Sequence, residues 1–445
     1  MAPPMVLLKR DVVLPHVEEV SRRESLRPRL GRDPGCFEEM TDEVVAYMRT
    51  FKAHAVVADP PELSFLDILV PPESLALKPP YVNLKSCRLS SSDKNLVALY
   101  AGAYTPGSTV NMMRMGGYLI YDARDNSLSP IPHLPDDHFH MYTGSKSAVV
   151  MCNGDDGRYV LAEFVRVRPG FSHAAVWLWK SSAPGSGSGS GWALLSSRLH
   201  LLPTFSTHLC FSYRGSVLCW VDLLGGMVVC DLGKDCNNPN PQLRFIPLPL
   251  DCPSYDGPLP GDDDSGNRYR HLYVEEFRSM ACVGDTIKFV CLDGNVEQLP
   301  GKGFDLTVYT LSPDLSEWTI DRKYNVGNIW ANEAYHSTGM PKLAPSYPVL
   351  SINEDGVIYL VFALLTVMDH TPLGTRRRQV QCKSQYIIRV NMKNNKVQLY
   401  QQSTESRIHS QFLASEISAY QPCLQDHPGG MEAGELGASG KRIKF

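Results

Sequence analysis

The chain has 445 residues, more than one compact domain usually holds, so its length favours two domains or one architecture that grows by repetition. Hydrophobic residues make up 43% of the chain, which is enough to build sizeable cores. Lys and Arg number 43 against 47 Asp and Glu, and this near balance argues against the uniformly positive surface that nucleic-acid binding favours.

Residues 1–59 are poorly patterned and form the first predicted region. The opening MAPPMVLLKRDVVLPH contains an apolar stretch that is too short and too interrupted for a signal peptide. The Arg-rich span 21–32 would suit an organellar transit peptide, but Glu24 within it weakens that interpretation, so we expect a cytoplasmic or nuclear protein. A helix-like pattern over 37–51 predicts one short helix.

Residues 60–424 form the second predicted region and are typical of an all-β protein. From about Pro79, short apolar runs alternate with clusters of Gly, Asp, Asn and Pro, the pattern of many short antiparallel strands. Hairpin turns are predicted at 293–294, 355–356 and 394–395, where Asp-Gly or Asn-Asn tolerates positive φ. The longest apolar run, 357–368, is shorter than the ~20 residues that cross a bilayer, so no membrane span is expected.

One β unit recurs along this second region. GYLIYD at 117–122 is followed by IPHLP at 131–135, and GSVLCWVDLLGGMVVCDL at 215–232 is followed by RFIPLPL at 244–250. In each copy an apolar strand ends at a polar turn and another strand follows. Repetition of such a unit predicts a β-propeller-like array of short antiparallel strands, in which each blade packs on its neighbours. Because the spacing is irregular, a pair of β-sandwich domains stays open as an alternative.

Asp122 and Asp231 each end a strand of that unit and stand at the entrance to a turn. A carboxylate in this position can accept hydrogen bonds from backbone N–H groups one or two residues further on, which fixes the turn and the register of the next strand. The rival interpretation makes them catalytic acids that recur because the blades recur. We expect the structural role, because bonding of this local kind is what Asp commonly does in turns.

Three stretches are predicted to lack regular structure. Residues 181–191 have the Gly/Ser composition of a flexible linker, and 253–267 form a polar excursion rich in Pro and Asp. Residues 425–445 are Gly-rich with a basic end, and form the third predicted region, a disordered tail. Since proteases cut flexible backbone first, mild proteolysis is expected to begin within 181–191 or 253–267.

The sequence contains no legible motif for catalysis, cofactor binding or metal binding. Asp136, His138 and His140 alternate and would share one face of an extended strand, but without a third imidazole an ordinary loop is favoured. The acidic run 262–264 lacks the spacing of an EF-hand loop. The Gly-rich stretch after 184 and GKGF at 301–304 lack the other residues of phosphate-binding loops. We therefore predict no catalytic residue, no metal ion and no cofactor.

Cysteine and tryptophan are predicted to be structural. The 12 Cys include no CxxC pair, and several lie inside apolar runs, so they are expected to be reduced core thiols. Trp177 and Trp179 alternate in a predicted strand and are expected on one packed face, rather than in a binding cage with Trp220.

Arg376, Arg377 and Arg378 make the strongest basic patch of the chain. Such a cluster could contact phosphate or act as a nuclear-import signal. We favour a solvated loop between two strands, because the overall charge is balanced. Nucleic acid is not expected as a partner.

The segment WVDLLGGMVVCDL, followed by LRFIPLPL, resembles the hallmark of a plant family known as domain of unknown function 1618, which is expanded in grasses. GYLIYD, IPHLP and the later EISAY at 416–420 are similar to that family as well, so that the resemblance runs in order from about Pro60 to Tyr420. It implies the strand-and-turn grammar of F-box-associated and kelch-like propellers and no assigned activity. The predicted N-terminal helix is too short for an F-box of the chain's own.

Two hypotheses about function follow. The first is a non-catalytic, monomeric interaction scaffold whose blade loops bind an unidentified protein partner, since recognition normally lies on loops between short strands. The second is a hydrolase or glycan-active propeller enzyme with carboxylates converging at its central channel. Two or more buried carboxylate or His side chains facing one pocket would favour the enzyme.

Overall fold

The computed structural model describes part of the chain, and all structural statements below concern that part. The described residues are 5–12, 42–79, 84, 87–102, 117–135, 140–142, 146–154, 157–167, 173–181, 191–200, 205–233, 241–252, 274–293, 305–370, 377–402 and 411–421.

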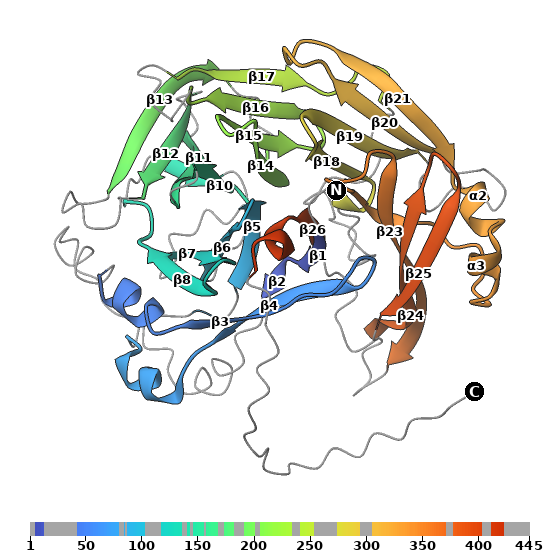
Figure 1. Ribbon diagram of the computed structural model, residues 1–445, viewed down its shortest axis with the longest axis horizontal. Helices are drawn as coiled ribbons and strands as arrows, with labels where there is room; N and C mark the ends of the chain where they lie inside the picture. Colours follow the sequence, from blue (N-terminus) through green and yellow to red (C-terminus); the bar gives the residue numbers. More distant parts are fainter. Residues whose placement is uncertain are drawn as a thin grey trace.

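The described chain folds into six small sheets arranged in a ring, which is a six-bladed β-propeller (Figure 1). The predicted all-β propeller is therefore confirmed, and the alternative of two β-sandwich domains is not what the chain forms. We number the blades 1 to 6 in ring order, starting from the blade that joins the two ends of the chain.

Blades 4, 5 and 6 are built from consecutive strands, each paired antiparallel with the next. Blade 4 contains β14 (Leu209–Tyr213), β15 (Val217–Asp222), β16 (Gly226–Asp231) and β17 (Leu243–Pro247). Blade 5 contains β18 (Arg278–Val283), β19 (Thr286–Asp293), β20 (Asp305–Leu311) and β21 (Trp318–Asn325). Blade 6 contains β22 (Ser346–Leu350), β23 (Val357–His370), β24 (Arg377–Asn391) and β25 (Lys396–Gln402).

Blades 2 and 3 follow the same plan with one added strand each. Blade 2 contains β5 (Cys87–Asp93), β6 (Leu96–Ala101), β7 (Gly117–Asp122) and β8 (Ser127–Ile131), with β2 (Asp11–Val12) paired to β5. Blade 3 contains β10 (Ala148–Asn153), β11 (Arg158–Val167), β12 (His173–Lys180) and β13 (Trp192–His200), with β9 (His140–Tyr142) paired to β11.

Blade 1 closes the ring by combining strands from distant parts of the chain. Its order is β26 (Phe412–Ser415), β1 (Val6–Lys9), β4 (Leu63–Leu69) and β3 (Lys52–Val56). The first strand pairs antiparallel with the last, Val6 opposite Ser415, and parallel with β4, Leu7 opposite Leu63. Strands from residues 1–59 therefore belong to the propeller, although the sequence pattern of that region is weak.

The apolar core lies between the blades and not inside any one of them. All six residues of β15 are buried because the strand packs on both faces. Leu218 and Trp220 contact the cluster shared with blade 3, and Cys219 and Val221 contact the cluster shared with blade 5. A strand covered on both sides can be apolar throughout, and this explains the continuous apolar runs in the sequence.

Helical structure is sparse among the described residues. Residues 42–48 form a helix within the span 37–51 that the sequence predicts, and they pack between blades 1 and 2 through Val44, Tyr47 and Met48. The others are at most six residues long: η2 (Pro72–Leu77), η4 (Val274–Glu276), α2 (Gly327–Trp330), α3 (Glu333–His336) and η5 (Ile417–Ala419). No helix in the described part of the chain is long and apolar enough to cross a membrane.

The predicted turns differ in their outcome. Asn394 and Asn395 lie between β24 and β25, and Gly356, with φ of +82°, lies directly before β23, as predicted. The prediction of a tight turn at 293–294 is wrong, because β19 extends to Asp293 and pairs with β20, which begins only at Asp305. Residues 182–190, 253–267 and 425–445, predicted to lack regular structure, lie outside the described residues.

Candidate functional site

The first strands of the blades approach one another near the centre of the ring (Figure 1). Charged residues with little solvent exposure lie next to several of these strands. Arg10 follows β1, Lys146 lies two residues before β10, and Glu275 lies in η4 ahead of blade 5. Charges are seldom buried without partners, since removing an ion from water is costly. This central cluster is therefore the first place to look for function.

Lys146 connects three parts of the ring. Its Nζ donates to Glu275 Oε1 over 2.9 Å and to Oε1 of Gln411, which directly precedes β26. The Lys146 and Glu275 side chains are only 8% and 17% exposed, so the pair is largely shielded from solvent. The interaction ties blade 3, the start of blade 5 and the closing strand of blade 1 together.

The pKa shifts of this pair reflect burial and mutual attraction. Burial alone would raise the pKa of Glu275, but the charge of Lys146 and of the neighbouring His208 lowers it to about 2. Burial lowers the pKa of Lys146 in spite of Glu275, because the ammonium is the more deeply buried partner and Arg10 repels it. In a simple ion pair the pKa of the acid falls and the pKa of the base rises, whereas here both pKa values fall. We conclude that the carboxylate is ionised at neutral pH.

Arg10 fixes the first strand of blade 2. Its Nη1 donates to the carbonyl oxygens of Leu89 and Ser90 at 3.2 and 2.8 Å, and its own carbonyl accepts from Leu89 N at 2.8 Å. Burial lowers the pKa of Arg10 to about 10, which leaves the guanidinium charged at neutral pH. Ser90 Oγ in turn accepts from Ala148 N at 3.1 Å, so the chain of bonds continues into blade 3.

Other buried carboxylates are also bound to neighbouring blades. Glu163 on β11, 2% exposed, accepts from Ser147 Oγ and from Tyr118 Oη of blade 2, the latter at 3.1 Å. Glu276 accepts from Tyr347 Oη of blade 6 at 3.3 Å. The Asp93 carboxylate of blade 2 accepts from Cys152 N of blade 3 at 2.7 Å. Each of these carboxylates is thus bonded to another blade or within its own, and none of the three lines either of the two cavities described next.

A cleft of about 240 Å³ lies between blades 2 and 3. Three basic residues line it together with Asn95 and Tyr420: Lys94, Arg124 and Arg158. Arg124 also donates to Asp122 Oδ2 at 2.6 Å, so part of this positive charge is balanced. Apolar groups such as Leu96 line it as well, so the cleft is of mixed character.

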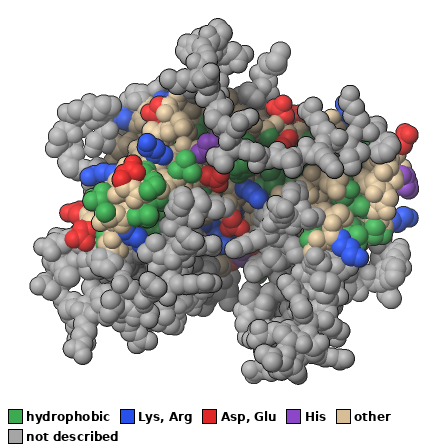
Figure 2. All heavy atoms as spheres, turned by 90° about the horizontal axis from the view of Figure 1, so that it is seen from below, with side chains coloured by type: hydrophobic (Ala, Val, Ile, Leu, Met, Phe, Trp, Pro, Cys, Tyr) green, Lys and Arg blue, Asp and Glu red, His purple; other side chains and the backbone are tan. Residues whose placement is uncertain are grey.

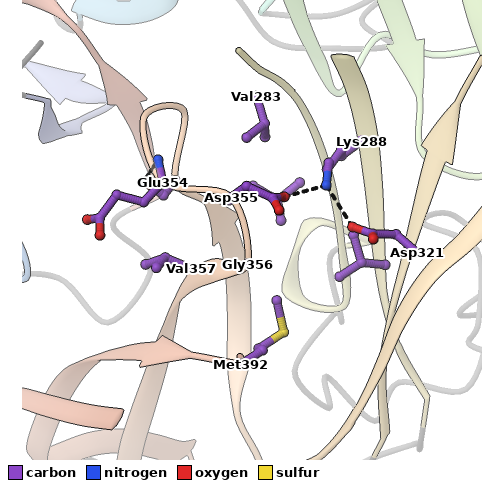
Figure 3. A pocket seen from close by; sticks show the side chains of 11 residues that line it. Val283, Lys288, Asp321, Glu354, Asp355, Gly356, Val357 and Met392 are labelled. Atoms are coloured by element: carbon purple, nitrogen blue, oxygen red, sulfur yellow. Dashed lines mark hydrogen bonds and ion pairs between the residues drawn. The ribbon is translucent and has the colours of Figure 1, made fainter. Parts of the chain in front are cut away.

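A much smaller cavity lies between blades 5 and 6 (Figure 3). Lys288 projects between two carboxylates, 2.6 Å from Asp321 Oδ2 and 2.5 Å from Asp355 Oδ1, and Lys393 contacts Asp355 at 2.8 Å. The cavity measures about 10 Å³, room for a single water molecule. Together these ion pairs link blades 5 and 6, and the cavity beside them has no space for a substrate.

The structure places Asp122 and Asp231 at equivalent positions, the ends of the third strands of blades 2 and 4. Asp122 Oδ1 lies 3.0 Å from Arg124 N, and Asp231 Oδ1 lies 2.8 Å from Gly233 N. Asn391 ends the third strand of blade 6 and accepts from Lys393 N at 2.9 Å in the same way. Each bond reaches two residues forward, which is the geometry of an Asx turn.

Of the predicted basic patch, Arg377 and Arg378 begin β24, opposite His370 and Asp369 of β23, while Arg376 lies outside the described residues. Asp136 and His138 also lie outside them, and of His140 only the backbone is described. Within the described chain, no group of three or more His, Cys, Asp or Glu side chains is arranged to hold a metal ion.

The three Trp residues do not form a cage. Trp177 and Trp179 share one packed face between blades 2 and 3, as predicted, and Trp179 meets Trp192 edge-on with ring centroids 5.7 Å apart. Trp220 lies between blades 3 and 4 instead, where it stacks on Phe164 with ring centroids 5.1 Å apart.

The buried cysteines are thiols, as predicted from the sequence. Burial raises the pKa of thiols such as Cys87, Cys210 and Cys219, which keeps them protonated and unreactive.

The central cluster was missed in the sequence because its members are far apart along the chain. Arg10, Lys146, Glu275 and Gln411 share no spacing, and each looks like an ordinary surface residue. Asp222 was also missed, although it lies within a segment that the repeat singles out. Its side chain accepts from Ser206 N and Leu224 N at 3.1 and 2.9 Å.

Comparison with solved structures finds other propellers at very low sequence identity. The β-propeller domain of the Trilobed protease from Pyrococcus furiosus is 8% identical, with 71% of this chain and 95% of that chain covered and a TM-score of 0.29. The GH43 endo-arabinanase from Bacillus licheniformis is 10% identical, with 66% and 92% covered and a TM-score of 0.24. No curated protein matches the sequence.

Comparison with family models finds one match, in the middle of the chain. The matching family is described as Protein of unknown function (DUF1618). The stretch runs from β15 of blade 4, through blade 5, to β23 of blade 6. Over residues 220–359, then, the chain is similar to a family of proteins of unknown function, DUF1618.

Proposed function

We propose that the protein is a non-catalytic scaffold that acts as a monomer in the cytoplasm or nucleus and binds another protein through the outside of its ring. The observation that carries this proposal is the bonding of Lys146 to both Glu275 and Gln411. A carboxylate that is the counter-charge of the lysine joining three parts of the ring is poorly placed to act as a general acid or nucleophile, because protonating or moving it would leave a buried ammonium without its counter-charge.

The proposed recognition surface is the outward face of the β3–β4 hairpin in blade 1, defined by Phe65 and Leu69. These side chains are 36% and 43% exposed, whereas Leu66 and Ile68, on the other face of the same strand, are buried against blade 2. Exposed aromatic and aliphatic side chains gathered on one face favour protein association.

Polar groups accompany this apolar face. His54 lies opposite Asp67 across the hairpin, and Lys52 lies opposite Leu69. Burial raises the pKa of Asp67, although His54 and Lys9 oppose the shift. An apolar centre with charged neighbours is the usual composition of a non-obligate protein interface. Figure 2, which views the molecule from below, likewise shows positive, negative and hydrophobic side chains interspersed on the visible described surface.

The test is affinity capture from the native tissue with three versions of the full-length chain. The parent is compared with the double variant Phe65→Lys/Leu69→Lys and with Ile320→Lys, a control on β21 of blade 5 whose side chain is 45% exposed. We expect at least one protein to be captured by the parent and the control and lost with the double variant. Equal capture by all three folded proteins would refute the proposed surface, and hydrolysis of a glycan by the parent would refute the scaffold itself.

A further inference from the structure

The segment that follows β17 leaves blade 4 and lies against blade 5. Trp318 Nε1 on β21 donates to Pro247 O at 2.8 Å, and Tyr309 Oη on β20 donates to Asp251 O at 3.4 Å. Cys252 N donates back to Pro249 O at 3.1 Å and closes a turn. Three bonds therefore fix the position of Cys252 over blade 5.

Cys252 meets a second thiol there. Cys291 lies on β19, buried in the cluster between blades 4 and 5, and Cys252 packs against that same cluster. The two side chains are hydrogen-bonded to one another. Cys252 is partly exposed and Cys291 is buried, so an oxidant in solution reaches Cys252 first.

A guanidinium group completes the arrangement. Arg278 lies directly opposite Cys291 in the β18–β19 pair, and its side chain also hydrogen-bonds to the Cys291 thiol. Arg278 itself is held in place by its bond from Nη1 to Leu223 O at 2.9 Å. Its positive charge lies beside Cys291 and favours the thiolate form of that sulfur at the moment when it attacks.

The surroundings of Cys291 keep its sulfur protonated. The hydrogen bond with Cys252, followed by burial, raises the pKa of Cys291, and Arg278 opposes this shift. Cys291 therefore keeps its proton. An accessible sulfur next to a second, resolving thiol is the arrangement that redox-sensing pairs use.

We propose that Cys252 and Cys291 are an oxidation site, at which a peroxide converts the two thiols into one disulfide. The Cys252 thiolate attacks one oxygen of hydrogen peroxide, the O–O bond breaks, and hydroxide leaves and takes up the thiol proton, which gives a sulfenic acid and water. The Cys291 sulfur then attacks the sulfenic sulfur, its proton joins the leaving hydroxyl, and a second water departs. The peroxide accepts the two electrons that the sulfurs lose.

The bond would link the end of blade 4 to the second strand of blade 5 across a loop of roughly 40 residues, a length at which a cross-link restricts the unfolded chain appreciably. Oxidation is therefore expected to stabilise the interface between these blades. The effect does not depend on the proposed recognition surface, which lies on blade 1.

The site is tested by treating the purified full-length protein with hydrogen peroxide, quenching in acid, alkylating the remaining thiols and mapping peptides by mass spectrometry. The matched control is Cys282→Ser, because Cys282 is the other partly exposed thiol among the described residues and donates to Gly284 O at 2.9 Å instead of to a thiol. We expect a linked 252–291 peptide in the parent and in Cys282→Ser, and its complete loss in Cys252→Ser.

Two further outcomes would overturn the proposal. One is a parent in which Cys252 is oxidised to sulfinic acid or pairs with another of the 12 cysteines, since Cys291 would then not be the resolving thiol. The other is a parent that stays fully reduced at a peroxide concentration that oxidises free cysteine. A repeat in urea, where the unfolded chain brings no two thiols together, should lose the selectivity for the 252–291 pair.

Discussion

Blade 4 and blade 1 reach the same four-stranded form by opposite routes. Blade 4 is continuous in sequence, and its first three strands are joined by short turns, as Asp222 opposite Gly226 shows. Blade 1 takes its strands from both ends of the chain, and Leu7 pairs parallel with Leu63. A local blade can form by itself early in folding, whereas blade 1 can form only when loop closure has brought the ends together.

Because blade 4 packs against blades 3 and 5, a substitution in its buried core is expected to destabilise the whole molecule. Trp220→Ala removes a fully buried ring that stacks on Phe164 and donates from Nε1 to Ser147 O at 2.7 Å. Truncating such a residue costs about 3–5 kcal/mol of unfolding free energy. Urea denaturation should show this loss with Trp220→Ala and almost none with the exposed Ile320→Ala. A loss below about 1 kcal/mol would mean that blades 3 and 4 are not packed as described.

Lowering the pH should open blade 1, which closes the ring, before it opens blade 4, which is continuous in sequence. The pKa of Glu275 lies at about 2 in the folded protein, below its ordinary 4.5. A lowered pKa contributes stability above pH 4.5 that is lost as the pH falls from 4.5 to 2, here about 3 kcal/mol. Since Lys146 also holds Gln411, hydrogen exchange in β1 and β26 should rise in this range before exchange in β15 and β16 does. Simultaneous opening of both blades would contradict the comparison.

Two glycines of blade 4 allow the energetic cost of steric crowding to be distinguished from the cost of backbone strain. Gly226 has φ of +155°, and a Cβ there would lie 2.4 Å from Ile246 O and 2.6 Å from Phe245 Cζ. Gly215 has φ of +64° with open space around it. Both replacements by Ala incur backbone strain of about 1 kcal/mol, but Gly226→Ala should lose roughly 1–3 kcal/mol more through the clash. Thermal denaturation of the two variants gives the difference, and equal losses would show that β16 and β17 pack less closely.

The smallest expected effect concerns the turn after blade 4's third strand. Asp231→Ala removes the acceptor of Gly233 N and should cost on the order of 1 kcal/mol, while Asp231→Asn keeps an oxygen there and should be mild. Chemical denaturation of both variants, together with partner capture, checks this. If both remained fully stable and lost the partner equally, Asp231 would be a site residue and not a turn residue.

The same contrast explains what could be predicted from the sequence. The strands of blade 4 and the turn positions of Asp122 and Asp231 are encoded within a few residues, so apolar runs and polar turns reveal them. The pairing of Val6 with Ser415 leaves no local pattern, which is why residues 1–59 are poorly patterned in the sequence. Lys146 and Glu275 meet only when the ring closes, so no spacing could have indicated them.

The structural role of the central charges is tested most directly by Glu275→Gln. The amide keeps the size of the side chain but leaves Lys146 without its counter-charge, which should cost about 3–5 kcal/mol. Lys146→Met/Glu275→Leu, which removes both charges, should recover most of that loss. Urea denaturation and partner capture are measured on the parent and both variants. We predict reduced stability with unchanged capture below the unfolding transition; unchanged stability with loss of capture or of any activity would make Glu275 a functional-site residue and contradict the account.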